Sequence, residues 1–503
     1  MERAPRSPSG TPEPGERPAL DGRVLGVLVA VKLALHLATA NRYGYFRDEL
    51  YFLDLGRHLA WGYVDTAPLI ALYARVALLL GGSLVVLRTI AALAGAAKVV
   101  LTLLLARELG GRRFAQLLAG LCALLAPIFL GIDSIFTMNG FEPLFWMGCL
   151  WVLLRIVRGG DSRLWLAFGA SAGLGLMNKH SALLFGAAVA IALVLSPQRR
   201  ELARPWIWLG LLIALGIFLP NILWQAQHHF PTLEDLRNVK ESGKNVVLSP
   251  LAFVGQQVLS LHPILLPVWL AGLGALLFGR LRWARVVGLT YLALLALMLA
   301  GKAKGYYLAP IYPVLFAAGA AAIEGWLDAR PLTRERLLPR VLIATLLVLS
   351  TAPYVPAILP FLPPDQLLSY QRRVGAAPQK TEVRHEGPLE QRLGDQLGWP
   401  ELVADVARIY HSLPPEERAR TGIFASNYGE AGALNRYGPE LGLPAPICAH
   451  QNHFFWGPPK VEPENLIWLQ WSRKGVEEHC RSVEQAGEHS HPWGMSEENR
   501  PIF

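Results

Sequence analysis

Eleven long apolar runs constrain the fold of this chain more than any other feature. A helix needs roughly 20 apolar residues to cross the hydrocarbon core of a bilayer. The 503-residue chain is 52% hydrophobic and only 17% charged, which is too apolar for a soluble protein of this size. The sequence therefore predicts a polytopic α-helical membrane protein with about 11 spans. The predicted spans are 23–40, 84–106, 115–131, 141–157, 163–177, 181–196, 206–225, 251–278, 286–300, 306–327 and 340–361.

The net charge of +9 comes from short basic loops between alternate runs. Loops rich in Lys and Arg remain in the cytoplasm, so the N-terminus is expected inside and the segment after the last run outside. This distribution explains the charge without a nucleic-acid partner. The basic loops are 107–113, 155–163, 198–204, 280–285 and 330–340.

Composition divides the chain into three parts. Residues 1–22 are rich in Pro, Gly, Ser and Arg and are predicted to be a disordered cytoplasmic segment. Residues 23–362 form the membrane domain. Residues 363–503, the C-terminal tail, are polar and are predicted to form a soluble α/β domain on the outer face, with a helix over 399–411 and a strand over 466–471.

Cys448 and Cys480 both lie in the C-terminal tail. A disulfide is chemically allowed in an exported segment. The distance between the two thiols decides whether the disulfide forms, so the sequence allows both a disulfide and two free thiols.

Two adjacent carboxylates follow the first apolar run, in the stretch Arg47-Asp48-Glu49-Leu50-Tyr51. Charge at membrane level is costly unless it is used, so the pair is a candidate general base or metal ligand. The alternative is a solvated pair that caps a helix at the interface. An amphipathic stretch at 69–81 follows and predicts an interfacial helix.

Lysines also stand at the outer ends of the predicted spans, against the inside-positive pattern. Lys179, Lys302 and Lys304 can snorkel toward the headgroups, or they can hold an anionic headgroup through charge-assisted hydrogen bonds. Lys98 lies well inside the second run. An intramembrane lysine indicates a functional site, unless it only neutralises a carboxylate or lines a wet cavity.

Several stretches at the outer ends of the spans resemble motifs of the GT-C membrane glycosyltransferases. This class includes the protein O-mannosyltransferases and the lipid A aminoarabinose transferases, and the chain is most similar to their bacterial dolichyl-phosphate-mannose-transferase-like relatives. The resemblance covers roughly residues 23–470. It is carried by 47–51 with 55–70, 138–146, 175–184 and 304–313, and in the tail by 427–433 with 453–458.

The resemblance implies transfer of a sugar from a polyprenyl-phosphate-linked donor to a lipid, glycan or protein of the cell envelope, on the outer face of a bacterial inner membrane. Asp48 and Glu49 would be the catalytic pair. Asp48 would deprotonate the acceptor hydroxyl as it attacks the anomeric carbon, in one inverting displacement. The implied partners are the donor, the acceptor and membrane lipids.

The resemblance also implies supporting residues. Glu49 and Glu142 would shape the polar site or hold a divalent cation such as Mg, Mn or Ca, and whether a metal is needed stays open. Glu142 stands where many relatives carry Asp, and Asp133 precedes it by nine residues, so either could enter the site. The donor phosphate, which is also the leaving group, would be bound by Lys179, Lys302, Lys304 and Tyr306.

Two other classes of function fit parts of the pattern. A transporter or flippase of lipid-linked sugars would also need charges near an anionic headgroup, but the two halves of the chain do not repeat each other as in many transporters. A sensor of cell-wall precursors could stack a sugar on tail aromatics. The residues that could do so are Tyr428, His450, His453 and Trp456.

Overall fold

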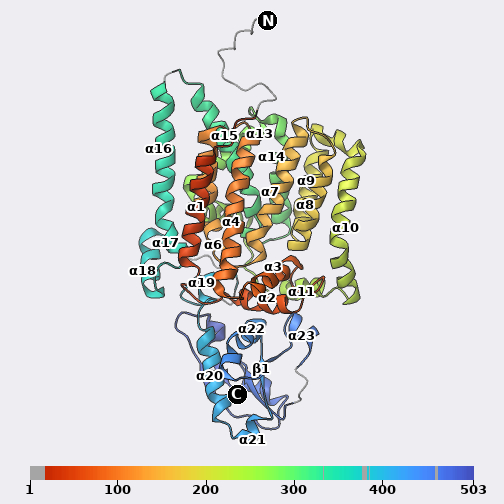
Figure 1. The fold of residues 1–503 in the computed structure, drawn as a ribbon, viewed down its shortest axis with the longest axis vertical. Helices are drawn as coiled ribbons and strands as arrows, with labels where there is room; N and C mark the ends of the chain where they lie inside the picture. The colour runs from red at the N-terminus through yellow and green to blue at the C-terminus, as the bar shows by residue number, and fades with distance from the viewer. Residues whose placement is uncertain (1–16, 332, 377–381, 384–385, 459–462) are drawn as a thin grey trace.

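Long helices run side by side through the chain before residue 362, as the computed structural model shows (Figure 1). The structure describes residues 17–331, 333–376, 382–383, 386–458 and 463–503. The main helices of the bundle are α1 (Gly22–Thr39), α4 (Leu84–Glu108), α5 (Arg113–Leu125), α7 (Met138–Val157), α8 (Leu164–Asn178), α9 (Ala182–Val194), α10 (Pro205–Gln227), α13 (Leu266–Leu277), α14 (Arg285–Ala300), α15 (Tyr312–Asp328) and α16 (Thr333–Thr351).

Within the described residues, 7 helices are long and apolar enough to cross a membrane, or up to 9 if each bent pair counts as one span. Each predicted run contains a helix, but prolines shorten or bend some of them. Pro127 starts a separate short helix, α6 (Pro127–Ile132). Pro263 follows the end of α12 (Pro250–Leu261), and the chain bends there by 93°, because proline cannot continue the hydrogen-bond ladder. The polytopic helical fold is confirmed, whereas the count of eleven spans stays a prediction.

The basic loops meet at the end of the bundle that lies away from the tail (Figure 1). Glu324 of α15 accepts hydrogen bonds from the backbone N–H groups of Arg112 at 2.6 Å and Phe114 at 3.0 Å. Arg158 donates to the Glu108 carbonyl at 2.6 Å. The geometry therefore places these loops on one side, as their charge predicts.

Part of the predicted disordered segment packs against the same end. Residues 1–16 lie outside the described residues. Arg17 forms an ion pair with Glu108 at 3.0 Å, and the Pro18 carbonyl accepts from Arg107 Nε at 2.8 Å. The described part of the segment is thus held by the C-terminal end of α4.

Shorter helices lie across the opposite end of the bundle, where the tail begins (Figure 1). They include the helix predicted over 69–81, which the structure places at 69–79. Its exposed side chains include Leu72, Val76 and Leu79, as expected of a helix at a membrane surface. The helices of this region are α2 (Arg47–Arg57), α3 (Leu69–Leu79), α11 (Pro231–Glu241), α17 (Val355–Ile358), α18 (Pro364–Val374) and α19 (Gln391–Gly394).

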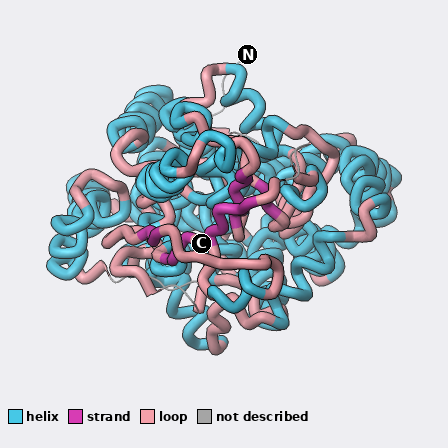
Figure 2. Tube along the Cα trace, turned by 90° about the horizontal axis from the view of Figure 1, so that it is seen from below, coloured by secondary structure: helices cyan, strands magenta, loops and turns pink. Residues whose placement is uncertain are grey.

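The tail contains a five-stranded sheet of strand order β2-β1-β3-β5-β4, seen near the centre of Figure 2. The first three strands in this order are parallel, with Ile423 opposite Ile467, and β4 and β5 are antiparallel. The predicted helix and strand of the tail are both present. The elements are β1 (Thr421–Ala425), β2 (Ile447–Cys448), β3 (Asn465–Leu469), β4 (Gly487–His489), β5 (Arg500–Ile502), α20 (Trp399–Ser412), α21 (Pro415–Arg418), α22 (Tyr428–Tyr437), α23 (Asn452–Trp456) and α24 (Arg473–Glu477).

The larger hydrophobic core of the tail is continuous with the bundle, whereas a small cluster around Trp468, Val476 and Phe503 belongs to the tail alone. Ile423 of β1 and Leu434 of α22 belong to the same buried cluster as Leu50 of α2. This continuity fixes the tail directly on the helix that carries the carboxylate pair. Cys448 and Cys480 are both free thiols.

Candidate active site

Three consecutive charged residues open helix α2, and each points in a different direction. The helix begins at Arg47 because Glu49 reaches back and accepts the N–H of Phe46 at 2.8 Å, which closes the first turn. Successive side chains leave a helix about 100° apart. Arg47 therefore meets the tail, Asp48 meets a cavity and Glu49 enters the bundle.

Glu49 is fully buried and bound on both carboxylate oxygens. Oε2 lies 3.3 Å from Arg88 Nη2, and Oε1 accepts the N–H of Phe136 at 2.7 Å. These contacts join α2 to α4 and to the loop before α7. The structure thus does not bring Glu49 into the cavity with Asp48, and its catalytic role stays a prediction.

Asp48 lies in the wall of a cavity of about 680 Å³. The wall near Asp48 is polar and includes Asn139, Lys304 and Tyr306. The parts of α6, α12 and α17 that line the cavity are largely apolar. The cavity thus combines polar and charged side chains with an apolar lining, which includes Ile128, Ile132, Leu248, Leu259, Pro263 and Ile358.

Tyr428 of the tail completes the wall beside Asp48. Helix α22 can approach α2 closely because Gly429 and Gly432 face it: a Cβ at Gly432 would lie 2.8 Å from Leu50 Cβ. The Tyr428 hydroxyl donates to Asp48 Oδ1 at 2.9 Å. Burial raises the pKa of Tyr428, so its hydroxyl keeps the proton that it donates.

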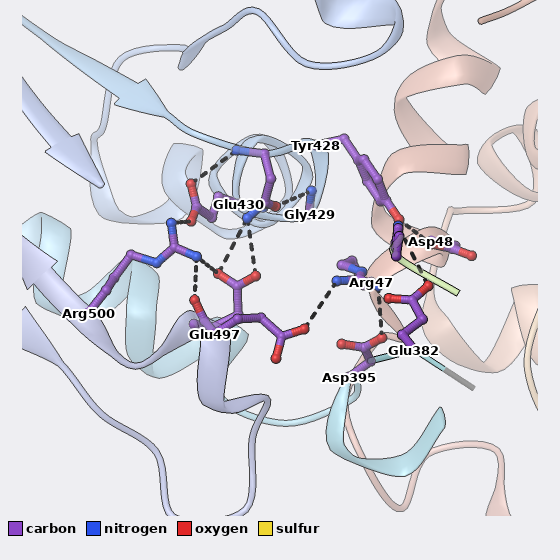
Figure 3. Close-up of polar contacts among 12 residues, drawn as sticks. Arg47, Asp48, Glu382, Asp395, Tyr428, Gly429, Glu430, Glu497 and Arg500 are labelled. Atoms are coloured by element: carbon purple, nitrogen blue, oxygen red, sulfur yellow. Dashed lines mark hydrogen bonds and ion pairs between the residues drawn. The ribbon is translucent and has the colours of Figure 1, made fainter. Parts of the chain in front are cut away.

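Arg47 links the start of α2 to two separate segments of the tail (Figure 3). Its guanidinium lies 3.4 Å from Asp395 Oδ2 and 3.9 Å from Glu497 Oε1. Burial raises the pKa of Asp395 to about 8, although Arg47 opposes this shift. Behind this contact, Arg500 pairs with Glu430 of α22 at 2.7 Å. The tail is therefore bonded to α2 both at Arg47, through Asp395 and Glu497, and at Asp48, through Tyr428.

Four cations line the cavity, namely Arg47, Lys244, Lys304 and Arg392. Lys304 and Lys244 lie 3.7 Å and 3.5 Å from the same oxygen of Glu382, and all three residues are in the wall. Arg392 also lines it and donates to Ser134 Oγ at 3.2 Å. Lys244 and Lys304 thus lie together in one part of the wall, and Arg392 also donates to the Ile358 carbonyl of α17 at 2.9 Å.

The other predicted phosphate ligands differ in position. Lys179 donates to Asn139 Oδ1 at 2.8 Å and to Glu142 Oε2 at 3.1 Å, and its ammonium lies 5.6 Å from the centre of the Tyr306 ring. Lys179 and Glu142 therefore do not line the cavity themselves, but Lys179 contacts two residues that do, Asn139 and Tyr306. Lys302 is exposed and is not among the lining residues.

Asp133 is buried away from the cavity. Its carboxylate lies 2.8 Å from Lys32 Nζ and 2.6 Å from Lys98 Nζ, and the three side chains have no exposed surface. In the structure, Lys98 thus neutralises a buried carboxylate, that of Asp133. Asp133 and Glu142 do not meet.

The carboxylates expected to hold a divalent cation do not converge. Among the described residues, no group of three or more His, Cys, Asp and Glu side chains is placed to hold a metal ion. Glu49, Asp133 and Glu142 are each bound to a cationic side chain instead. These three carboxylates do not fit a shared metal ion, so no step of the proposed reaction is assigned to a metal.

Sequence reasoning missed several lining residues, namely Lys244, Glu382 and Arg392. None stands in a recognisable motif. The only role that the sequence suggests for Tyr428 is to stack on a sugar. In the structure it stacks on His450, with ring centres 5.2 Å apart. Trp456 stacks on His58 with ring centres 4.3 Å apart, so these tail aromatics pack within the protein.

Comparisons with known proteins agree with this architecture. A family model described as dolichyl-phosphate-mannose-protein mannosyltransferase matches residues 65–224. Comparison with curated protein sequences gives no significant match.

Solved structures are similar over most of the chain. ArnT from Cupriavidus metallidurans bound to undecaprenyl phosphate is 15% identical, with a TM-score of 0.61, and the match covers 95% of this chain and 97% of ArnT. The apo form of the Archaeoglobus fulgidus oligosaccharyltransferase is 13% identical, with a TM-score of 0.51, and the match covers 82% of this chain and 63% of that protein. The resemblance expected from the motifs is confirmed, and the chain has the fold of the GT-C membrane glycosyltransferases.

Proposed function

We propose that this protein transfers a sugar from a polyprenyl-phosphate-linked donor to an acceptor of the cell envelope, at the tail side of a bacterial inner membrane. The single observation that carries the proposal is the cavity, whose wall combines the Asp48 carboxylate and several cations with a large apolar lining. The fold supports it, since the similar ArnT structure contains undecaprenyl phosphate.

The proposed reaction is one displacement at the anomeric carbon. An acceptor hydroxyl oxygen forms the new bond to this carbon while the bond to the phosphate oxygen breaks, and the electron pair leaves with the polyprenyl phosphate. Asp48 takes the hydroxyl proton. Lys304, Lys244 and Arg392 stabilise the negative charge that the leaving phosphate gains. Attack opposite to the leaving group inverts the anomeric centre.

Purified protein in nanodiscs, mixed with synthetic polyprenyl-phosphate sugars and candidate acceptors, tests the proposal. We expect free polyprenyl phosphate and a glycosylated acceptor of inverted configuration, detected by mass spectrometry and NMR. A transporter would move the donor and leave it chemically intact. Mass spectrometry of envelope glycans and glycolipids from cells with and without the protein would identify the sugar and the acceptor.

Lys304→Ala is expected to raise the donor concentration needed for half-maximal rate by about 10-fold, because one charge-assisted bond to the phosphate is lost. The matched control is Lys302→Ala, which removes an exposed lysine two residues away. Donor titrations of both variants distinguish the two positions. Equal effects would contradict the assignment of the phosphate to Lys304 in preference to Lys302.

Tyr428→Phe removes the hydroxyl that orients Asp48 and leaves the ring and its packing. A hydrogen bond to a charged group contributes about 1.5–3 kcal/mol, so we expect kcat to fall by at least about 10-fold. The donor KM should change little, because Tyr428 bonds to the base and not to the cations. A variant with unchanged kcat would show that Asp48 needs no support from the tail.

A further inference from the structure

An exposed apolar surface continues from the bundle onto the tail. Helix α10 is a candidate span, and only 22% of its most apolar window is buried inside the protein. This helix therefore presents most of its side chains to hydrocarbon. Its exposed apolar residues extend from one end to the other: Trp208, Leu209, Leu211, Leu212, Leu215, Leu219, Ile222 and Leu223.

At the end of α10, the apolar surface passes to short helix α23 of the tail. The Phe455 ring packs edge-on against Trp224, with centres 6.1 Å apart, and against His228, with centres 5.2 Å apart. Phe454 packs against Phe455 at 5.5 Å and is 66% exposed. Trp61, whose carbonyl accepts from Asn221 of α10 at 2.9 Å, is 63% exposed.

Helix α11 adds an amphipathic side to the same region, at the junction of bundle and tail (Figure 1). It starts just after α10, and Leu233 and Leu236 are 63% and 59% exposed. The same helix carries exposed charges of both signs, including Lys240 and an Arg237–Glu241 ion pair at 3.5 Å. Exposed apolar side chains next to charged ones make the helix amphipathic, as are helices that lie in the interface of a bilayer.

We infer that α23 is a membrane contact of the tail, in which Phe454 and Phe455 insert at the headgroup level beside α10 and α11. The occupant is the lipid bilayer because the patch is continuous with the lipid-facing surface of α10. Aromatic side chains are enriched at this depth, and an exposed apolar patch of this kind indicates a membrane or protein contact.

The same segment is bonded to the helix that carries Asp48. Asn452 Oδ1 accepts the N–H of Val64 at 2.7 Å, and the Asn452 N–H donates to the Tyr51 hydroxyl at 3.3 Å. His453 Nε2 lies 3.3 Å from Asp54 Oδ2. A bilayer contact at α23 thus fixes the height of the tail relative to the membrane at the point where the tail meets α2.

Site-directed spin labelling of the full chain tests this inference. A nitroxide is placed at Phe454→Cys, in a background in which Cys480 is replaced by Ser, in liposomes of phosphatidylethanolamine and phosphatidylglycerol. Glu464→Cys, an exposed tail position, is the matched control. Both substitutions remove exposed side chains, so the fold is expected to be kept, and gel filtration of the labelled proteins checks this.

Collision rates with oxygen, which partitions into lipid, and with a water-soluble nickel complex give the depth of each label. We expect the oxygen-to-nickel ratio at 454 to exceed that at 464 several-fold in liposomes. Similar ratios at the two positions would overturn the inference. Protection of 454 from both reagents would also overturn it, because a protein partner would then cover the patch.

Discussion

Asp48→Asn is expected to lower kcat by about 10²–10⁴-fold, the usual contribution of a general base. The amide has nearly the same shape as the carboxylate and can still accept the Tyr428 hydroxyl, so the contact between α2 and α22 should persist. The amide, unlike the carboxylate, cannot take a proton from the acceptor hydroxyl. Donor binding should be retained, because Lys244, Lys304 and Arg392 remain.

Single-turnover transfer and equilibrium binding of a labelled donor separate the two effects. Asp365→Asn is the matched control, because it makes the same chemical change at an exposed position of α18 outside the cavity. Turnover of Asp48→Asn within about 10-fold of the unmodified protein would exclude Asp48 as the base. Loss of donor binding together with turnover would instead assign it to the binding of the donor.

The choice between Asp48 and Glu49 illustrates what the sequence can predict. The pattern of apolar runs and basic loops placed both carboxylates at the tail side of the bundle, because span length and charge are local properties of the chain. Which one faces the cavity depends on where α2 begins. Phe46 is not a usual capping residue, so the helix start, and with it the direction of each side chain, could not be predicted.

The contribution of the tail to the site was even less predictable. Tyr428 and Asp48 are 380 positions apart in the chain, and their contact results from the packing of Gly429 and Gly432 against α2. Arg392 reaches the cavity from a segment without a motif. Such contacts are set by tertiary packing over long separations, which a single sequence does not reveal.

Asp133 presents the opposite case, since the sequence suggested a site residue and the structure shows an enclosed charge cluster. Two lysines share one carboxylate, so the cluster holds more cationic groups than anionic ones. The packing around it is tight: a Cβ at Gly95 would lie 2.8 Å from both Asp133 Oδ2 and Lys32 Cε. Its stability must therefore depend strongly on which charge is removed.

Asp133→Asn is expected to destabilise the protein by about 3–5 kcal/mol, because it leaves two buried ammonium groups without a counter-ion. Lys32→Met should change stability by only about 1 kcal/mol, since Lys98 and Asp133 then form a neutral pair and a buried charge is lost. Thermal unfolding of both variants in the same detergent measures the difference. Equally small destabilisation of both variants would mean that water or lipid headgroups reach the cluster, because only solvation could replace the missing carboxylate. An Asp133→Asn variant that remained stable but had lost sugar transfer would instead indicate that Asp133 acts in catalysis.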